Sequence, residues 1–237
     1  MRINKSKKNI NHNPYNTHKK IKLHGICVCE NFGDYLDYTM SYNRSIFDTI
    51  TIVTTTEDYE TRRVCHKYNL NIVITDRLHK DGAPFNKAAG LNDGYSQMNK
   101  DGWVVIFDSD MVFPSFNNIL KRLDKRCLYG IPRKNIGHRT NKIKLQSVPS
   151  NFKINAQPGR VVIGYCQIFY APHLGHKKLY NERYKSANRS DTRFALQWER
   201  DKNIHIDNLY CYHISREKVN WRGRKSPKLK VSDASKK

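Results

Sequence analysis

Short apolar runs alternate with helix-like segments along the first 110 residues, and this alternation constrains the fold more than any other feature. Four runs are bulky and apolar, with many β-branched members, as buried strands are. They are LHGICVC (23–29), DTITIVTTT (48–56), NIVITD (71–76) and WVVIFDSD (103–110). Helical patterns over residues 34–46, 57–70 and 85–98 separate them. The alternation predicts βαβ units and an α/β fold, with a mixed, mostly parallel sheet flanked by helices.

The second half of the chain is less regular. We expect strands over residues 126–132, 161–172 and 208–215, and a helix over 190–200. Residues 134–160 are polar and show no periodicity, so they are predicted to form a functional loop or insertion.

The charge balance restricts the partners rather than the fold. The 237 residues hold 43 Lys and Arg against 21 Asp and Glu, a formal net charge of +22. Much of the excess lies in residues 1–22 and 225–237, which we predict to be flexible basic tails around one domain of residues 23–224. Such tails favour peripheral contact with an anionic membrane surface or another polyanion.

The location of the protein is predicted from what the sequence lacks. No apolar stretch follows the N-terminal charges, as a secretory signal would require, and no window reaches the roughly 18 apolar residues of a membrane span. The six cysteines form no CxxC pair and lie mostly in apolar runs. We therefore expect a cytoplasmic protein with reduced thiols, without a cysteine-rich zinc site or an integral membrane segment.

Asp108 and Asp110 end the most hydrophobic of the predicted strands, where ligands of parallel α/β sheets bind. The pair is either a turn, a phosphatase nucleophile with its acid, or a clamp for a divalent cation. Haloacid-dehalogenase-like phosphatases place such a strand first in the domain, whereas three predicted strands precede this one. Two carboxylates separated by one residue suit a hard cation, Mn²⁺ or Mg²⁺, and diphosphate oxygens would complete the coordination shell of that cation. The clamp is the favoured interpretation, and the phosphatase remains an alternative.

Three quoted segments carry a family resemblance. They are ENFGDYLDYTMSYNRSIFDTITIVTTTEDYET, FNKAAGLNDGY and GWVVIFDSDMVFP. Together they resemble family-2-like glycosyltransferases of the GT-A (Rossmann-like) fold, well over residues 23–115 and less sharply over 160–222. The resemblance implies a metal-dependent enzyme that transfers a sugar from a UDP- or GDP-type donor to a hydroxyl on a glycan, lipid-linked or protein acceptor. Inversion at the anomeric carbon is expected, with a donor-binding half (23–115) and an acceptor half (116–224).

The same resemblance implies roles at the donor end. Asp108, Asp110 and His213 would bind the metal, and the two aspartates would also contact the donor. The other implied donor-binding residues are Thr54, Glu57, Asp58, Asn86, Lys87, Ser109, Trp221, Arg222 and Arg224. For Thr54, Glu57 and Asp58, a helix N-terminus is an equally good explanation.

At the acceptor end, the resemblance implies that Asp191 removes the proton of the attacking hydroxyl. Ser190 precedes it where an acid is usual, and a charge at a helix terminus explains Asp191 equally well. Glu182 and Glu199 are lesser candidates, and Gln167 is predicted to bind the acceptor.

A non-catalytic, basic nucleic-acid-binding protein is the remaining alternative. The net charge favours it. The sequence shows no zinc-finger spacing and no aromatic RNA-binding signature, and its basic excess gathers in the tails.

Overall fold

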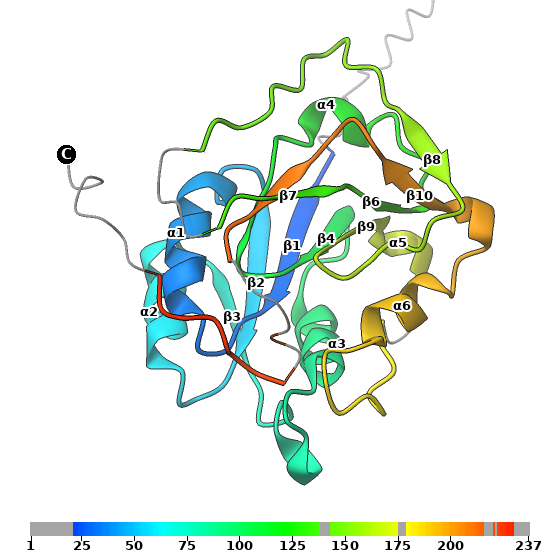
Figure 1. Cartoon of the computed structure of the whole chain (residues 1–237). Coiled ribbons are helices and arrows are strands. Elements are labelled where there is room, and N and C mark those ends of the chain that lie inside the picture. Colours follow the sequence, from blue (N-terminus) through cyan, green and yellow to red (C-terminus); the bar gives the residue numbers. More distant parts are fainter. Residues whose placement is uncertain (1–20, 138–142, 175–178, 216–219, 221, 230–237) are drawn as a thin grey trace, which may run out of the picture.

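A central sheet of eight strands, in the order β3-β2-β1-β4-β9-β6-β10-β8, organises the protein (Figure 1). The structure is a computed structural model. It describes residues 21–137, 143–174, 179–215, 220 and 222–229. Most of both predicted basic tails lies outside these residues.

The four strands predicted in the first half of the chain are all present. They are β1 (Leu23–Val28), β2 (Thr49–Thr54), β3 (Asn71–Ile74) and β4 (Trp103–Phe107). They pair with one another in parallel. Their carboxyl ends therefore share one edge of the sheet, where ligands of such folds bind.

The second half of the chain extends the sheet beyond β4. The added strands are β9 (Cys166–Tyr170), β6 (Leu128–Gly130), β10 (Asn203–Ile206) and β8 (Ala156–Pro158). β9 is antiparallel to β4 and β6, β10 is parallel to β6, and β8 is antiparallel to β10. Parallel pairings outnumber antiparallel ones, which confirms the predicted α/β class with a mixed, mostly parallel sheet.

Helices cover both faces of this sheet. The longer ones are α1 (Gly33–Asn43), α2 (Tyr59–Lys67) and α3 (Lys87–Gln97). The shorter α-helices are α4 (Asn117–Leu120), α5 (Ala171–Leu174) and α6 (Ser190–Ala195), and there are two short 3₁₀ helices, η1 (Lys80–Gly82) and η2 (Arg200–Lys202). Because strand side chains alternate, Val105 and Phe107 join the apolar cluster beneath α1 and α2, whereas Val104 and Ile106 join the cluster beneath α3 and α6.

A second, three-stranded sheet in the order β5-β11-β7 lies beside the carboxyl edge of β4. Its strands are β5 (Met111–Val112), β11 (Cys211–His213) and β7 (Arg133–Asn135). His213 pairs with Met111, so strand pairing brings the end of β11 next to Asp110. β7 and β8 fall within or beside the predicted loop 134–160, and the prediction of irregular structure is wrong for those strands.

No helix among the described residues has the length and apolar character needed to cross a bilayer. The six cysteines are buried free thiols.

Candidate active site

A cavity of about 450 Å³ opens at the carboxyl ends of β1 and β4. Several predicted site residues line it, drawn from distant parts of the chain: Lys87, Asp108, Ser109, Asp110, Asp191 and His213. The loop after β1, the segment before β9 and the N-terminal end of α6 also contribute to its wall. The fold therefore brings the two predicted halves of the site into one cavity.

Asp110 and His213 form a close pair within this cavity. Asp110 is 7% exposed, and its Oδ2 lies 3.0 Å from Nε2 of His213. The backbone N–H of Ile214 donates to the Asp110 carbonyl at 3.1 Å, which fixes the two strands at this point. On the far side of the ring, Nδ1 lies 3.0 Å from Oδ1 of Asn135. A proton on Nδ1 would donate to this amide oxygen and leave the Nε2 lone pair directed at Asp110.

This pair fits two ligands of a divalent cation. Ligands about 2.1 Å from a cation and at right angles to one another lie about 3.0 Å apart, the spacing observed here. Ser215 Oγ, 2.8 Å from His213 Nε2, adds a further oxygen. When His213 instead carries a proton on Nε2, it donates to Asp110. Burial alone would raise the pKa of Asp110, but this hydrogen bond and the charge of His213 lower it, so the carboxylate form is favoured.

Asp108 lies apart from that pair. Its Oδ1 accepts a short hydrogen bond from Lys87 Nζ, and the described residues contain no cluster of three or more His, Cys, Asp or Glu side chains suited to a metal. The predicted three-ligand set is therefore reduced to Asp110 and His213, and diphosphate oxygens and water would have to complete the shell.

Lys87 supplies a buried positive charge to the cavity. Burial alone would lower the pKa of its ammonium group, but the charge and hydrogen bond of Asp108 and the charge of Asp191 raise it. Its position at the first residue of α3 follows from Asn86, the residue before it, whose Oδ1 accepts from the N–H of Ala89 at 3.0 Å. Asn86 is thus a helix cap and does not line the cavity, although we predicted donor contact.

Asp191 is held in a fixed orientation at the α6 side of the cavity. Its Oδ2 accepts from the N–H of Gly164 at 2.8 Å, and its Oδ1 accepts from the N–H of Thr192 at 2.8 Å. A Cβ atom at position 164 would lie 2.7 Å from the Cβ of Asp191, so only glycine permits this approach. Asp191 is therefore more than a helix-terminus charge, because it also ties α6 to the segment before β9.

Gln167 is fully buried and does not line the cavity. Its Nε2 donates to the carbonyl oxygens of Val162, at 3.0 Å, and Asp191, at 3.2 Å, and its Oε1 accepts from Tyr180. Both N–H groups of the amide are used within the protein and the side chain is inaccessible, so the predicted contact with an acceptor is wrong. Gln167 instead holds the backbone of Asp191 through the hydrogen bond to its carbonyl oxygen.

The predicted donor contacts after β2 serve the start of α2. Asp58 accepts from the backbone N–H groups of Thr61, at 3.0 Å, and Asn31, at 2.6 Å, and from Thr54 Oγ1 at 3.2 Å. Glu57 is exposed and lies outside the cavity lining. The N-cap explanation therefore holds for Asp58 and Thr54.

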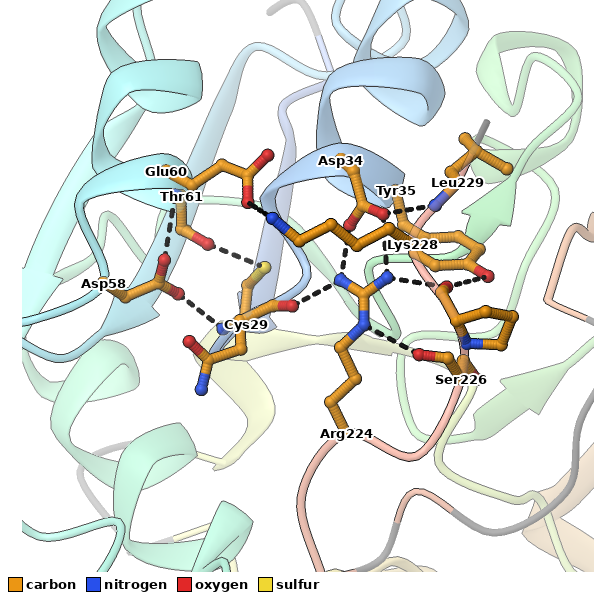
Figure 2. A network of polar contacts seen from close by, with 12 residues as sticks. Cys29, Asp34, Tyr35, Asp58, Glu60, Thr61, Arg224, Ser226, Lys228 and Leu229 are labelled. Atoms are coloured by element: carbon orange, nitrogen blue, oxygen red, sulfur yellow. Dashed lines mark hydrogen bonds and ion pairs between the residues drawn. The ribbon is translucent and has the colours of Figure 1, made fainter. Parts of the chain in front are cut away.

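Arg224 anchors a C-terminal strap, residues 222–229, on the N-terminal end of α1 (Figure 2). Its guanidinium donates to both carboxylate oxygens of Asp34, at 2.6 and 2.8 Å, and to the carbonyls of Asn31, Ser226 and Pro227 at 2.5, 2.9 and 2.7 Å. All five N–H groups are used, so the predicted contact between Arg224 and the donor is wrong.

The start of the predicted C-terminal tail also belongs to the folded domain. Leu229 is 8% exposed, and its N–H donates to Asp34 at 2.6 Å. Arg222 is exposed and outside the cavity lining. Trp221 lies outside the described residues.

Glu182 and Glu199, the lesser base candidates, do not line the cavity. Glu182 accepts from Arg77 and from Asn92 Nδ2, the latter at 2.7 Å.

The cavity wall includes residues that the sequence analysis did not assign to the site, among them Glu30, Phe32, Arg133, Arg189 and Asn220. Glu30 follows β1 as Asp108 follows β4, so the strand-end argument would have found it. The other four depend on long-range placement.

No family profile and no curated protein sequence matches the chain. Among solved structures, a mycobacterial protein superposes with a TM-score of 0.51 at 14% identity, over 85% of this chain and 70% of that one. Glucosyl-3-phosphoglycerate synthase from Mycobacterium tuberculosis, in complex with Mn²⁺ and UDP-glucose, gives 0.38 at 13% identity, over 48% of this chain and 44% of the enzyme. Mannosyl-3-phosphoglycerate synthase from Rubrobacter xylanophilus gives a TM-score of 0.37 at 14% identity, over 48% of this chain and 41% of that enzyme.

These likenesses concern the fold. The aligned part spans less than half of either synthase.

Proposed function

We propose that this protein is a glycosyltransferase that transfers a sugar from a UDP- or GDP-type donor to a hydroxyl group, with Mn²⁺ or Mg²⁺ as cofactor. The observation that carries the proposal is the pairing of Asp110 with His213 at 3.0 Å, in a cavity that also contains Lys87 and Asp191. A cation ligand pair, a largely buried ammonium group and an oriented carboxylate are groups that can promote transfer from a nucleoside diphosphate.

Asp110 and His213 would hold the cation against the diphosphate of the donor. When bound, the cation would offset the negative charge that develops on the leaving nucleoside diphosphate. Lys87 would contact the same phosphates as a point charge, exchanging its present partner Asp108 for a diphosphate oxygen. The released carboxylate of Asp108 would then be available to a donor hydroxyl.

Asp191 would act as the base at the acceptor side. It would accept the proton of the acceptor hydroxyl while the hydroxyl oxygen attacks the anomeric carbon, and direct displacement would invert that centre. The two backbone N–H groups hold one rotamer of this carboxylate, which limits the reorganisation needed for proton transfer.

Nucleotide release tests the proposal. Wild type is incubated with Mn²⁺ and each of a panel of UDP- and GDP-sugars, with simple glycosides as acceptors, and release of UDP or GDP is measured. We expect release from one donor class and a loss of at least about 100-fold in Asp191→Asn. Asp201→Asn is the matched control, because Asp201 is exposed and outside the cavity lining. No release above background from any donor would count against the proposal.

A further inference from the structure

The acceptor half contains a long stretch without any acidic residue. Residues 125–181 include eleven Lys and Arg and no Asp or Glu. In the fold this stretch supplies β6, β7, β8 and β9, and residues 143–155, which lead into β8, run over the top of the molecule in Figure 1. The excess of positive charge is therefore not confined to the tails, as the sequence analysis assumed.

Part of this charge reaches the cavity. Arg133 on β7 and Arg189 before α6 both line it, and both side chains are exposed. Within the described residues, no carboxylate lies at ion-pair distance from either guanidinium. By contrast Lys87, the other long cation of the cavity, is paired with Asp108. Two unpaired arginines thus remain at the acceptor side.

Aromatic packing orients the first of these arginines. Cζ of Arg133 lies 4.9 Å from the ring centroid of Tyr165, and Tyr165 itself is only 9% exposed. A guanidinium stacked on a ring keeps its edge free, and the edge carries the N–H groups that bind carboxylate or phosphate in pairs. Arg160 contributes a further positive charge near the ring, but its guanidinium lies 3.4 Å from Asp207 and it is outside the cavity lining. Burial raises the pKa of Tyr165, and the charges of Arg133 and Arg160 both oppose that rise.

The backbone at Arg189 gives separate support. Its φ is 66°, in the left-handed region, where the other non-glycine residues of the described chain are only Asn and Asp. For a residue with a Cβ atom, this conformation costs about 1–2 kcal/mol. Such conformations concentrate at functional sites, and here the conformation accompanies a free guanidinium at the cavity wall.

We infer that Arg133 and Arg189, named here the arginine rim, bind a negatively charged group on the acceptor, and that the acceptor is an acidic glycan. The inference rests on the proposed function, because it assigns a class of acceptor to that reaction. A carboxylate and a phosphate on the glycan would satisfy the rim equally well, since the shared chemistry is an oxyanion that accepts paired N–H bonds.

A glycan is favoured over single-stranded nucleic acid because cationic side chains lie over the faces of the nearby aromatic rings. Bases bind such surfaces by stacking on free aromatic faces. Here Arg133 covers Tyr165, and Lys134 Nζ lies 3.3 Å from the centroid of Tyr210. The surface thus offers cations supported by rings rather than rings open to bases.

Direct binding tests the inference without turnover. The probes are fluorescent oligosaccharides of equal length: an oligogalacturonide bearing carboxylates, an oligomannoside bearing phosphates, and neutral maltooligosaccharide, together with single-stranded oligothymidylate. The proteins are wild type, Arg133→Gln, Arg189→Gln and their combination. Arg126→Gln is the matched control, since it belongs to the same acid-free stretch but is paired with Asp124 at 2.7 Å.

We expect wild type to bind at least one acidic oligosaccharide at least tenfold more tightly than the neutral one. Each rim substitution should weaken that binding about tenfold, and the control should not. The preferred probe would identify the anion as carboxylate or phosphate. Equal binding of acidic and neutral probes, or unchanged binding in the combined variant, would overturn the inference. So would tight binding of oligothymidylate alone through the same arginines.

A parallel titration with UDP and GDP in the presence of Mn²⁺ separates the two proposals. Loss of glycan discrimination with intact nucleotide binding would refute only the arginine rim. Absence of nucleotide binding in wild type would refute the proposed function, whatever the glycan probes show.

Discussion

Replacing Arg224 tests how the strap is held on α1. Five N–H groups of this side chain donate to protein oxygens, and the guanidinium also lies 4.9 Å from the ring centroid of Phe32 and 5.2 Å from that of Tyr35. Lysine keeps the charge but offers three N–H groups and no planar fork. Methionine keeps much of the apolar stem and removes the charge.

The expected loss of stability follows from the burial of the pair. The side chains of Arg224 and Asp34 are 12% and 10% exposed. Removing one partner of a buried ion pair costs about 3–5 kcal/mol, and a hydrogen bond to a charged group contributes about 1.5–3 kcal/mol. We expect Arg224→Met to lower the free energy of unfolding by about 3–5 kcal/mol, and Arg224→Lys to lower it by about 2–3 kcal/mol.

Urea unfolding at pH 7, monitored by tryptophan fluorescence, measures these changes. Arg126→Lys is the matched control. Arg126 makes the same two-oxygen contact with Asp124, but the side chains are 69% and 37% exposed, so solvent screens the pair and no measurable loss is expected. Equal losses in the Arg224 and Arg126 variants would refute the argument from burial.

The same pair predicts a pH dependence. Burial alone would raise the pKa of Asp34, but the hydrogen bonds from Arg224 and the Leu229 N–H, with the charge of Arg224, lower it below its usual value. A lowered carboxylate pKa contributes stability that is present above the unfolded-state pKa of about 3.9 and lost as the pH falls through the folded-state value. The stability difference between wild type and Arg224→Met should therefore shrink below about pH 4. A difference that stays constant down to pH 2.5 would contradict this assignment.

Three further substitutions have defined outcomes. Gly164→Ala places a Cβ atom 2.7 Å from that of Asp191, so it should lower kcat at least about tenfold while nucleotide affinity stays within about twofold; an unchanged kcat would exclude a role for this carboxylate position. Gly94→Ala forces a methyl group of α3 against Val53, and about 1–3 kcal/mol of overpacking should outweigh the roughly 1 kcal/mol gained in helix propensity, which a lower urea midpoint with unchanged m would show. Arg189→Gly should raise the free energy of unfolding by up to about 1 kcal/mol, because glycine adopts the positive φ freely, and should weaken binding of acidic oligosaccharides; a destabilised variant would contradict the strain at this position.

The sequence predicts the donor half well because its elements are locally encoded. Residues 103–110 are apolar to Phe107 and then acidic, so both the strand and its polar end are visible without the fold. The helix at residues 87–97 is marked by Asn86 as its cap and by small residues that let it approach the sheet. The carboxyl-edge location of Asp108 and Asp110 follows from these local signals and the parallel pairing.

The rest of the site depends on long-range pairing that local patterns do not record. β5 and β7 have two and three residues, too few for any periodicity, yet they place His213 beside Asp110. Arg224 pairs with Asp34, which lies 190 positions earlier in the sequence. The local sequence around Arg224 does not identify that partner. For Gln167 the sequence shows a polar residue in a strand, and only the fold shows that the residue is fully buried and that its amide is hydrogen-bonded within the protein.

Calorimetric titration of UDP and GDP tests the central claim most directly. It is performed with and without Mn²⁺ on wild type, Asp110→Asn, His213→Gln and the control Asp201→Asn. We expect one nucleotide to bind only with the metal present, and the first two variants to lose that binding while the control keeps it. Metal-independent binding, or binding that survives both substitutions, would contradict the assignment of Asp110 and His213 as the cation ligands and with it the proposed mechanism of transfer.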